Sequence, residues 1–378
     1  MSCSVPLAPE GEEQLLEIGL ERLRELLGAG FETAPYNTGG QVRPRPDAAV
    51  DAMITVKDKS TGTYGVLLIE VKFGLTPVSV RRELAPRWDL LARLPGHITP
   101  LVIAPWLSPR TREELDRADY GYLDLSGNVS LDIPQPRVRL FLQGTKRDPT
   151  PHRAGSRGLV GSGAGRLVRL LVDVAPPYRA VGLAERSGLS LPYVSRLLRV
   201  MEDQGLIERS GRVVSGVDWA GLIRERAEQT NLLRANPAVA MVAPQGQRRV
   251  LDRLSDQPEL AQSVAVTGSA AARVVAPLTV GGQLMIYVPG QIQAPDDVGR
   301  QLGLLRSEQG GDVLLLRAGN PVVFERTRVV GGARHVALSQ LALDCLSGSG
   351  RMPAEGAVVL EYMAEGVDSW RLSGLEAA

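Results

Sequence analysis

Cysteine is nearly absent from this sequence. Cys3 and Cys345 are the two cysteines among 378 residues, and they stand far apart in the chain. They cannot form a disulfide framework, and they lack the paired spacing of a zinc site. The sequence therefore excludes a disulfide-rich secreted scaffold and a cysteine-based zinc fold.

Long apolar runs are also missing. No stretch is long enough to span a bilayer. The N-terminal segment MSCSVPLAPEGEE lacks the basic and apolar regions of a secretion signal. We therefore expect no membrane partner and a location in the reducing cytoplasm.

Aromatic residues are scarce and the net charge is small. Aromatics make up 4% of the chain, apolar residues 44%, and the formal net charge is +1. Aliphatic side chains must therefore build the cores, and the chain as a whole is no polycation. The charge is uneven, however, because residues 153–212 contain ten arginines and five acidic residues. Local basicity of this kind is the electrostatic footprint of a nucleic-acid contact.

The length and the breaks in composition predict an α/β multidomain protein. A segment rich in Gly, Pro, Ser and Arg follows the first 148 residues and has no apolar periodicity. A weaker break lies near Thr230. We expect an α/β domain over residues 1–148, a linker over 149–164, a helical domain over 165–229 and a second α/β domain over 230–378.

The first domain begins with a helix-periodic stretch that ends at Gly28 and Gly30. Strand-like runs follow at Phe31–Tyr36, Val50–Val56 and Tyr64–Phe73, and a helical stretch at Val80–Leu94. A further strand and helix come next, TPLVIAP and PRTREELDRAD. This order predicts a sheet with helices packed on it.

The central segment carries the strongest local pattern. VGLAERSG predicts a short helix that ends at Gly188, and Ser190 is a suitable N-cap for the next helix. In that helix an apolar stripe is expected to face inward, formed by Leu191, Val194, Leu197, Leu198 and Met201. The segment LIERSGRVVSGV then predicts a two-stranded hairpin that turns at Ser210-Gly211.

The stretch LAERSGLSLPYVSRLLRVMEDQGLIER resembles bacterial winged helix-turn-helix regulators. The resemblance implies double-stranded DNA as a partner, with one helix in the major groove and the hairpin on phosphates. The DNA-contacting residues would be Ser190, Tyr193, Ser195, Arg196 and Arg199 on the helix, with Arg209 and Arg212 on the hairpin. The alternative is a protein-contact module on which Arg196 and Arg199 are merely solvated.

A second candidate site lies in the first domain. Asp51 begins one apolar run, and Glu70-Val71-Lys72 ends the next. Residues two apart on a strand point to the same face. If the two strands are antiparallel neighbours, Asp51, Glu70 and Lys72 meet at one end of the sheet. Two carboxylates of this kind suit Mg²⁺, which could activate a water beside a phosphodiester.

This arrangement is similar to the PD-(D/E)xK restriction-endonuclease-like superfamily over residues 10–145. The resemblance implies that Asp51 and Glu70 are metal ligands and Lys72 the catalytic lysine. Asp47 is a less favoured stand-in for Asp51, and Glu13 or Glu17 could add a carboxylate. The alternative is an inactive fold that serves dimerisation or nucleic-acid docking. Asp124, near the Gly127-Asn128 turn, is expected to cap that turn rather than to act in catalysis.

The last domain is expected to be α/β. The segments TGSAAA, LMIYV and VALSQLALDCLSGSGRMPAEG resemble the C-terminal region of AbiEi-type antitoxins, which are winged-helix repressors. The large preceding domain departs from the usual arrangement of that family. The resemblance implies a possible protein partner.

Taken together, the sequence favours a DNA-binding transcriptional regulator that needs no cofactor and acts as a homodimer, because palindrome readers are usually dimeric. A Mg²⁺-dependent DNA endonuclease guided by the winged helix is the alternative. An antitoxin-like partner-binding protein is the second alternative.

Overall fold

The chain forms a mixed α/β structure, as expected from the sequence. A computed structural model describes residues 9, 11–36, 50–91, 97–145, 149, 159–275, 282–290 and 294–377. The N-terminal unit comprises Met1–Ser156 with Asp203–Gly205, and the C-terminal unit comprises Arg157–Glu202 and Leu206–Ala378. Asp47 and most of the expected linker lie outside the described residues.

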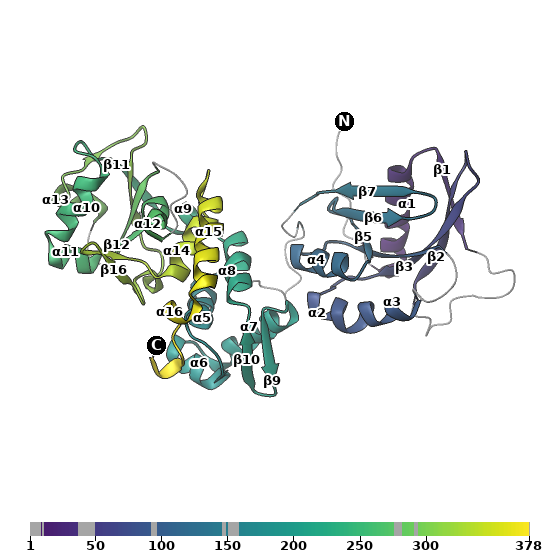
Figure 1. Ribbon diagram of the computed structural model, residues 1–378, viewed down its shortest axis with the longest axis horizontal. Helices are drawn as coiled ribbons and strands as arrows, with labels where there is room; N and C mark the ends of the chain where they lie inside the picture. Colours follow the sequence, from purple (N-terminus) through teal and green to yellow (C-terminus); the bar gives the residue numbers. More distant parts are fainter. Residues whose placement is uncertain are drawn as a thin grey trace. The chain divides into compact units, whose positions relative to one another are not determined.

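The N-terminal unit is a seven-stranded sheet with helices on both faces (Figure 1). Its helical segments are α1 (Glu12–Leu27), α2 (Pro77–Ser79), the π-helical turn η1 (Val80–Leu84), α3 (Ala85–Leu91) and α4 (Pro109–Arg117). Its strands are β1 (Phe31–Pro35), β2 (Ala52–Asp58), β3 (Tyr64–Val71), β4 (Ile98–Ala104), β5 (Gly121–Asp124), β6 (Val129–Ile133) and β7 (Val138–Leu142).

The strands lie in the sheet in chain order. The pairs β1–β2 and β2–β3 are antiparallel, β3–β4 and β4–β5 are parallel, and β5–β6 and β6–β7 are antiparallel. The α1 helix buries Leu15 and Leu23 against one face of the sheet. The opposite face is covered by Val80, Leu84 and Leu115 from η1 and α4. The central strand β3 is therefore buried on both faces, which explains its unbroken apolar run.

Most expected elements of this unit are present. The first helix ends at Leu27, and Gly28 follows with a φ of 73°. The stretch expected as one helix over Val80–Leu94 differs, because it consists of η1 followed by α3. Pro86 has no N–H to donate to the carbonyl of Arg82, so the regular α-helical ladder cannot run through this point. The last residues of that stretch lie outside the described part.

The C-terminal unit begins with the helix–turn–helix segment and its hairpin. The elements are α5 (Ser162–Asp173), β8 (Tyr178–Arg179), α6 (Ala180–Ser187), α7 (Leu191–Asp203), β9 (Ile207–Ser210) and β10 (Val213–Val217). The predicted hairpin is present, but its turn residues are Gly211 and Arg212, one position later than the sequence predicted, because Ser210 still pairs with Val213. Strand β8, which the sequence analysis did not anticipate, pairs with β10 to complete a three-stranded antiparallel sheet.

A second α/β layer follows in the same unit. Its helices are α8 (Trp219–Glu228), α9 (Leu232–Ala235), α10 (Gln247–Ser255), α11 (Pro258–Ser263), α12 (Gly268–Val275), α13 (Pro295–Gln301), α14 (Leu338–Leu346), α15 (Met352–Glu365) and α16 (Val367–Trp370), with 3₁₀ turns η2 (Pro321–Phe324) and η3 (Leu375–Ala377). Its strands are β11 (Ala238–Val242), β12 (Ala265–Thr267), β13 (Leu284–Val288), β14 (Leu305–Arg306), β15 (Val313–Arg317), β16 (Arg328–Val330) and β17 (Ala333–His335). They form a seven-stranded sheet in the order β14-β11-β15-β13-β12-β17-β16.

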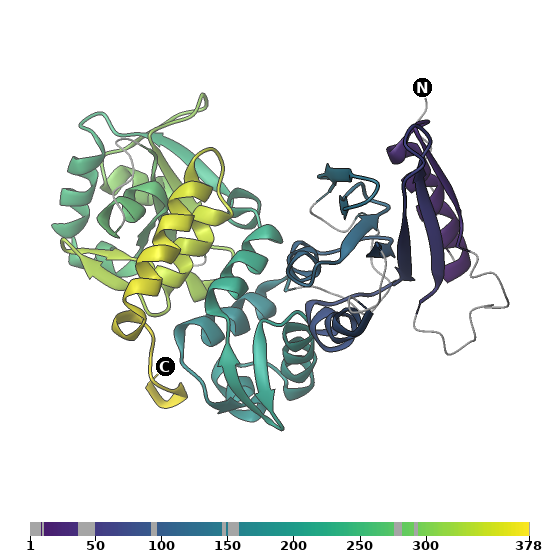
Figure 2. The same cartoon turned by 45° about the vertical axis from the view of Figure 1, so that its right-hand side comes forward.

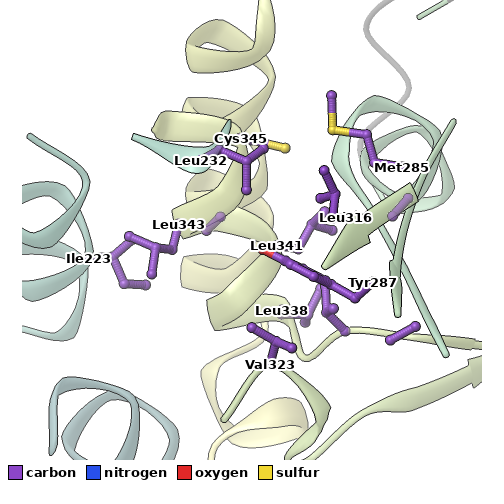
Figure 3. Close-up of a cluster of buried hydrophobic side chains, with 14 of the residues drawn as sticks. Ile223, Leu232, Met285, Tyr287, Leu316, Val323, Leu338, Leu341, Leu343 and Cys345 are labelled. Atoms are coloured by element: carbon purple, nitrogen blue, oxygen red, sulfur yellow. The ribbon is translucent and has the colours of Figure 1, made fainter. Parts of the chain in front are cut away.

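One hydrophobic core joins the two parts of this unit. It runs from Leu167 in α5 to Met363 in α15 without a break. Figure 3 shows α14 between the two parts, with Leu343 toward Ile223 of α8 and Leu341 toward the sheet residue Tyr287. Residues 165–229 and 230–378, expected from the sequence as separate domains, therefore share a common interior.

A buried polar network accompanies this core. Arg169 of α5 is 2% exposed and forms an ion pair of 3.0 Å with Asp173. Its guanidinium also donates to the Gln340 side chain of α14, at 2.6 Å. Gln340 in turn donates to the Asp344 carboxylate at 2.7 Å, which also accepts from Thr267 and Tyr287. The network thus ties α5 to α14 and to the sheet.

The segment after α16 returns to α5. Leu372 forms a bridge with Val174, and its N–H donates to the Asp173 carbonyl at 2.8 Å. The Arg371 guanidinium donates to the carbonyls of Leu171, Val172 and Val174. These carbonyls lie at the C-terminal end of α5, where a helix has no partners of its own. The segment therefore caps the first helix of the unit.

The described helices include none that is both long and apolar enough to cross a membrane.

Burial makes the stability of the C-terminal unit depend on pH at Asp344. Burial raises the pKa of Asp344 from 3.8 to about 6, although Thr267, Gln340 and Tyr287 donate to it. A raised folded-state pKa gives stability that is present below pH 3.8 and lost as the pH rises through 6. Burial also lowers the pKa of His335 from 6.5 to about 4. The contribution of His335 to stability therefore rises with pH in the same range, opposite to that of Asp344.

We expect the Asp344→Asn variant to separate the two effects. The free energy of unfolding of the wild type, minus that of the variant, should fall by about 2 kcal/mol between pH 4 and pH 7. Chemical denaturation at intervals across this range measures the difference, and the His335 contribution cancels because both proteins contain it. A difference that does not change with pH would contradict the raised pKa.

Candidate nucleic-acid interface and carboxylate site

The turn between α6 and α7 is built from Gly188, Leu189 and Ser190. Gly188 has a φ of 64°, the left-handed conformation that commonly ends a helix and that glycine adopts without strain. The Ser190 carbonyl accepts from the Val194 N–H at 3.0 Å, so α7 begins directly after an exposed Ser190. The turn therefore fixes the angle at which α7 leaves α6.

Helix α7 has one apolar and one polar face. Val194, Leu197, Leu198 and Met201 are at most 1% exposed. Leu191, expected on the same stripe, is 42% exposed, because it occupies the first helical position beyond the edge of the core. The apolar stripe thus begins one turn later than the sequence predicted.

The outer face of α7 carries the expected polar residues. Ser195, Arg196 and Arg199 are exposed, and Tyr193 is half-buried against the core. The Arg196 guanidinium lies 5.0 Å from the centre of the Tyr193 ring, a cation–π distance. Within the described residues, neither Arg196 nor Arg199 forms an ion pair. Both guanidinium groups are therefore open to an anionic partner.

The two hairpin arginines differ from each other. Arg212 is exposed at the turn between β9 and β10. The hairpin itself lies beside α7 (Figures 1 and 2). Arg209 points back toward α7 and pairs with Glu202 at 3.3 Å, with its side chain 25% exposed. Arg212 is therefore more available to an external anion than Arg209, which already has an acidic partner.

The structure brings the three predicted residues of the carboxylate site to one edge of β2 and β3. These strands are antiparallel, with Ala52 opposite Ile69, as the sequence prediction required. Lys72 Nζ lies 3.4 Å from Glu70 Oε2. Asp51 is close enough to raise the pKa of Glu70, and its own Oδ2 accepts from the Val71 N–H at 2.7 Å.

Arg87 of α3 is a further member of this site that the sequence analysis missed. Its guanidinium lies 3.3 Å from the same Glu70 oxygen. Burial raises the pKa of Glu70, which is 3% exposed, while Lys72 and Arg87 act to lower it. No sequence signal identified Arg87, because its orientation depends on how η1 and α3 pack on the sheet.

The charges of this site are already balanced. Two carboxylates, Asp51 and Glu70, face two cations, Lys72 and Arg87. A Mg²⁺ ion held by Asp51 and Glu70 would leave an excess of two positive charges, and one phosphodiester would neutralise one of them. The residues thus fit a metal only together with an anionic substrate. The described part of the chain has no group of three or more His, Cys, Asp or Glu placed to hold a metal.

The other carboxylates weighed for this site do not join it. Glu13 and Glu17 are exposed on α1, which packs on the sheet face carrying Ile69 and Val71. Glu70, which alternates with these residues along β3, points to the opposite face. Asp47 lies outside the described residues.

Asp124 caps a turn, as expected. Its carboxylate accepts from the N–H groups of Ser126, Asn128 and Leu107. The Asn128 side chain donates to the same carboxylate at 2.8 Å and accepts from Arg112. The bonds from Ser126 and Asn128 hold the β5–β6 turn, and those from Leu107 and Arg112 tie the turn to α4 and the loop before it.

Comparison with family models, curated proteins and solved structures found no match to this chain.

The two faces of α7 predict contrasting effects on stability. Replacing Arg199 or Arg212 by Ala should change the free energy of unfolding by no more than about 0.5 kcal/mol, because both side chains are solvated. Replacing Leu198 by Ala should cost about 2–5 kcal/mol, because it leaves a cavity in the core. Urea denaturation measures all three. A large loss in either arginine variant would mean that the arginine supports the fold.

Proposed function

We propose that this protein is a sequence-specific, DNA-binding transcriptional regulator that reads DNA with a winged helix. The observation that carries the proposal is the outer face of α7 and its hairpin, where Arg196, Arg199 and Arg212 are exposed and unpaired among the described residues. The reading helix is α7, and the hairpin of β9 and β10 is the wing.

The physical chemistry of DNA recognition supports this proposal. An α-helix fits the major groove, and an arginine fork can donate to both guanine acceptors at once. Arg196 and Arg199 are therefore the base readers, and Ser190, Tyr193 and Ser195 accompany them at the start of the helix. Arg212 contacts a phosphate, which sets register but not sequence.

The partner is double-stranded DNA, and the protein acts as a homodimer. One winged helix covers few base pairs, so two copies on a palindromic site give the required specificity. In this proposal the N-terminal unit binds DNA or a second protein without cutting it. The charge balance around Glu70 favours such a role.

We expect the Arg196→Ala and Arg199→Ala variants to lose affinity for the regulated DNA by about 1–3 kcal/mol each, roughly 5- to 150-fold. Binding to unrelated DNA should change less, since the lost contacts are to bases. A gel shift with DNA from upstream of the protein's own gene, against unrelated DNA, measures both.

The control for this experiment is Arg248→Gln, an exposed arginine on α10 that forms no ion pair among the described residues. It should bind both DNAs as the wild type does. Full binding by both α7 variants would contradict the assignment of α7 as the reading helix.

A second candidate function is a Mg²⁺-dependent DNA endonuclease guided by the winged helix. The observation in its favour is the contact of Lys72 with Glu70, with Asp51 beside them on the neighbouring strand. In this alternative Asp51 and Glu70 hold the ion, which supplies an activated water, and Lys72 stabilises the charge of the phosphodiester.

Cleavage of plasmid DNA in Mg²⁺ and in EDTA tests the second function. If it holds, nicking requires Mg²⁺ and is abolished in Lys72→Ala, while binding in EDTA is unchanged. Nicking that persists in Lys72→Ala comes from a contaminant and counts against the site. If the protein binds its own upstream DNA selectively and leaves the DNA uncut in Mg²⁺, the result supports the transcriptional regulator instead.

A further inference from the structure

A basic cavity adjoins the turn between α6 and α7. Its volume is about 360 Å³, and it lies within the C-terminal unit. The lining residues are Arg166 and Leu170 from α5, Arg186 and Ser187 from α6, and Glu325 and Arg326 after η2. No residue of the predicted DNA-contact set lines it, so it is a separate feature of the surface.

Positive charge dominates this cavity. Three guanidinium groups line it against one carboxylate, that of Glu325. Glu325 is already bound to Arg326 Nη1 at 3.0 Å. Arg186 is exposed and forms no ion pair with any described residue. The remaining charge of Arg166 and Arg186 is therefore available to an anion.

The guanidinium of Arg326 is held in place but not fully satisfied. Its Nε donates to the buried Asp173 carboxylate at 2.6 Å. Its Nη2 is buried and has no hydrogen-bond partner among the described residues. Arg326 is therefore fixed at the wall of the cavity by Asp173 and Glu325, and the guanidinium groups of Arg166 and Arg186 are the ones left for an anion.

Arg166 links the cavity to the turn. Its Nη1 donates to the Ser187 carbonyl at 3.0 Å, at the end of α6. The same nitrogen lies 3.4 Å from the point where a side chain on Gly188 would begin. An anion held by Arg166 and Arg186 would thus sit three or four residues before the start of α7.

We infer that this cavity binds a phosphate group, and that the phosphate belongs to the DNA backbone beside the site read by α7. The inference rests on the proposed function. In a DNA-bound helix–turn–helix the first helix crosses the backbone while the second enters the major groove. The surface beside α6 is therefore expected to face phosphates, and guanidinium forks such as those of Arg166 and Arg186 are well suited to bind them.

The test measures DNA affinity against salt concentration for the wild type, Arg186→Gln and the control Arg248→Gln. Each lost phosphate contact lowers the slope of log affinity against log salt by about 0.9. Arg186→Gln should show this drop, with an equal loss of affinity for upstream and unrelated DNA, because the contact carries no sequence information. A slope and affinities equal to those of Arg248→Gln would overturn the inference.

A second arm separates this inference from the proposed function and from a small phosphorylated ligand. Inorganic phosphate is titrated against the same three proteins, and the melting temperature is recorded. If the wild type binds no DNA, the proposed function fails. The claim that the bound phosphate belongs to the DNA backbone then fails with it. Stabilisation by phosphate that is lost only in Arg186→Gln would then support a site for a free phosphate. Equal responses of all three proteins would rule out the phosphate site.

Discussion

The burial of one guanidinium, that of Arg169, constrains the whole C-terminal unit. A cation removed from water must find an anion and acceptors for its donors, or the fold loses several kcal/mol. Asp173 supplies the anion, and Gln340 and the carbonyls of Val322 and Glu325 supply further acceptors. These partners come from α5, α14 and the segment between β15 and β16. Helix α5, which supports the elements proposed to read DNA, therefore cannot shift without disturbing the α/β layer.

This constraint explains what the sequence could and could not predict. Patterns within one element predicted much of the local structure: the apolar stripe of α7 is present from Val194 onward, and the hairpin is present with its turn one residue later than predicted. The shared core was not predicted, because Arg169 and Gln340 are 171 residues apart and each resembles a surface residue in its own segment. The short strand β8 was missed for the same reason, since two residues gain strand character only from their pairing with β10.

The candidate sites show the same contrast between local patterns, which the sequence predicts, and contacts between distant segments, which it does not. The sequence predicted that Glu70 and Lys72 share a face, because alternation along a strand requires it. It did not predict Arg87, whose position depends on the π-helical turn before α3, or the ion pair that turns Arg209 toward Glu202. The charges of the carboxylate site around Glu70 balance one another. The outer face of α7 instead presents arginines that have no ion-pair partner among the described residues. This electrostatic difference is the main reason for placing DNA recognition in the C-terminal unit.

The cap that Arg371 and Leu372 place on α5 has a consequence for biosynthesis. Arg371 and Val172, which it contacts, are separated by 199 positions, so a ribosome makes the helix long before its cap. Until then the last carbonyls of α5 depend on water, and the core beneath α6 and α7 lacks α14 and α15. The nascent chain therefore carries α7, the helix proposed to read DNA, on a core that is not yet complete. A product that ends before Arg371 would lack the cap on α5 and would hold α7 less rigidly.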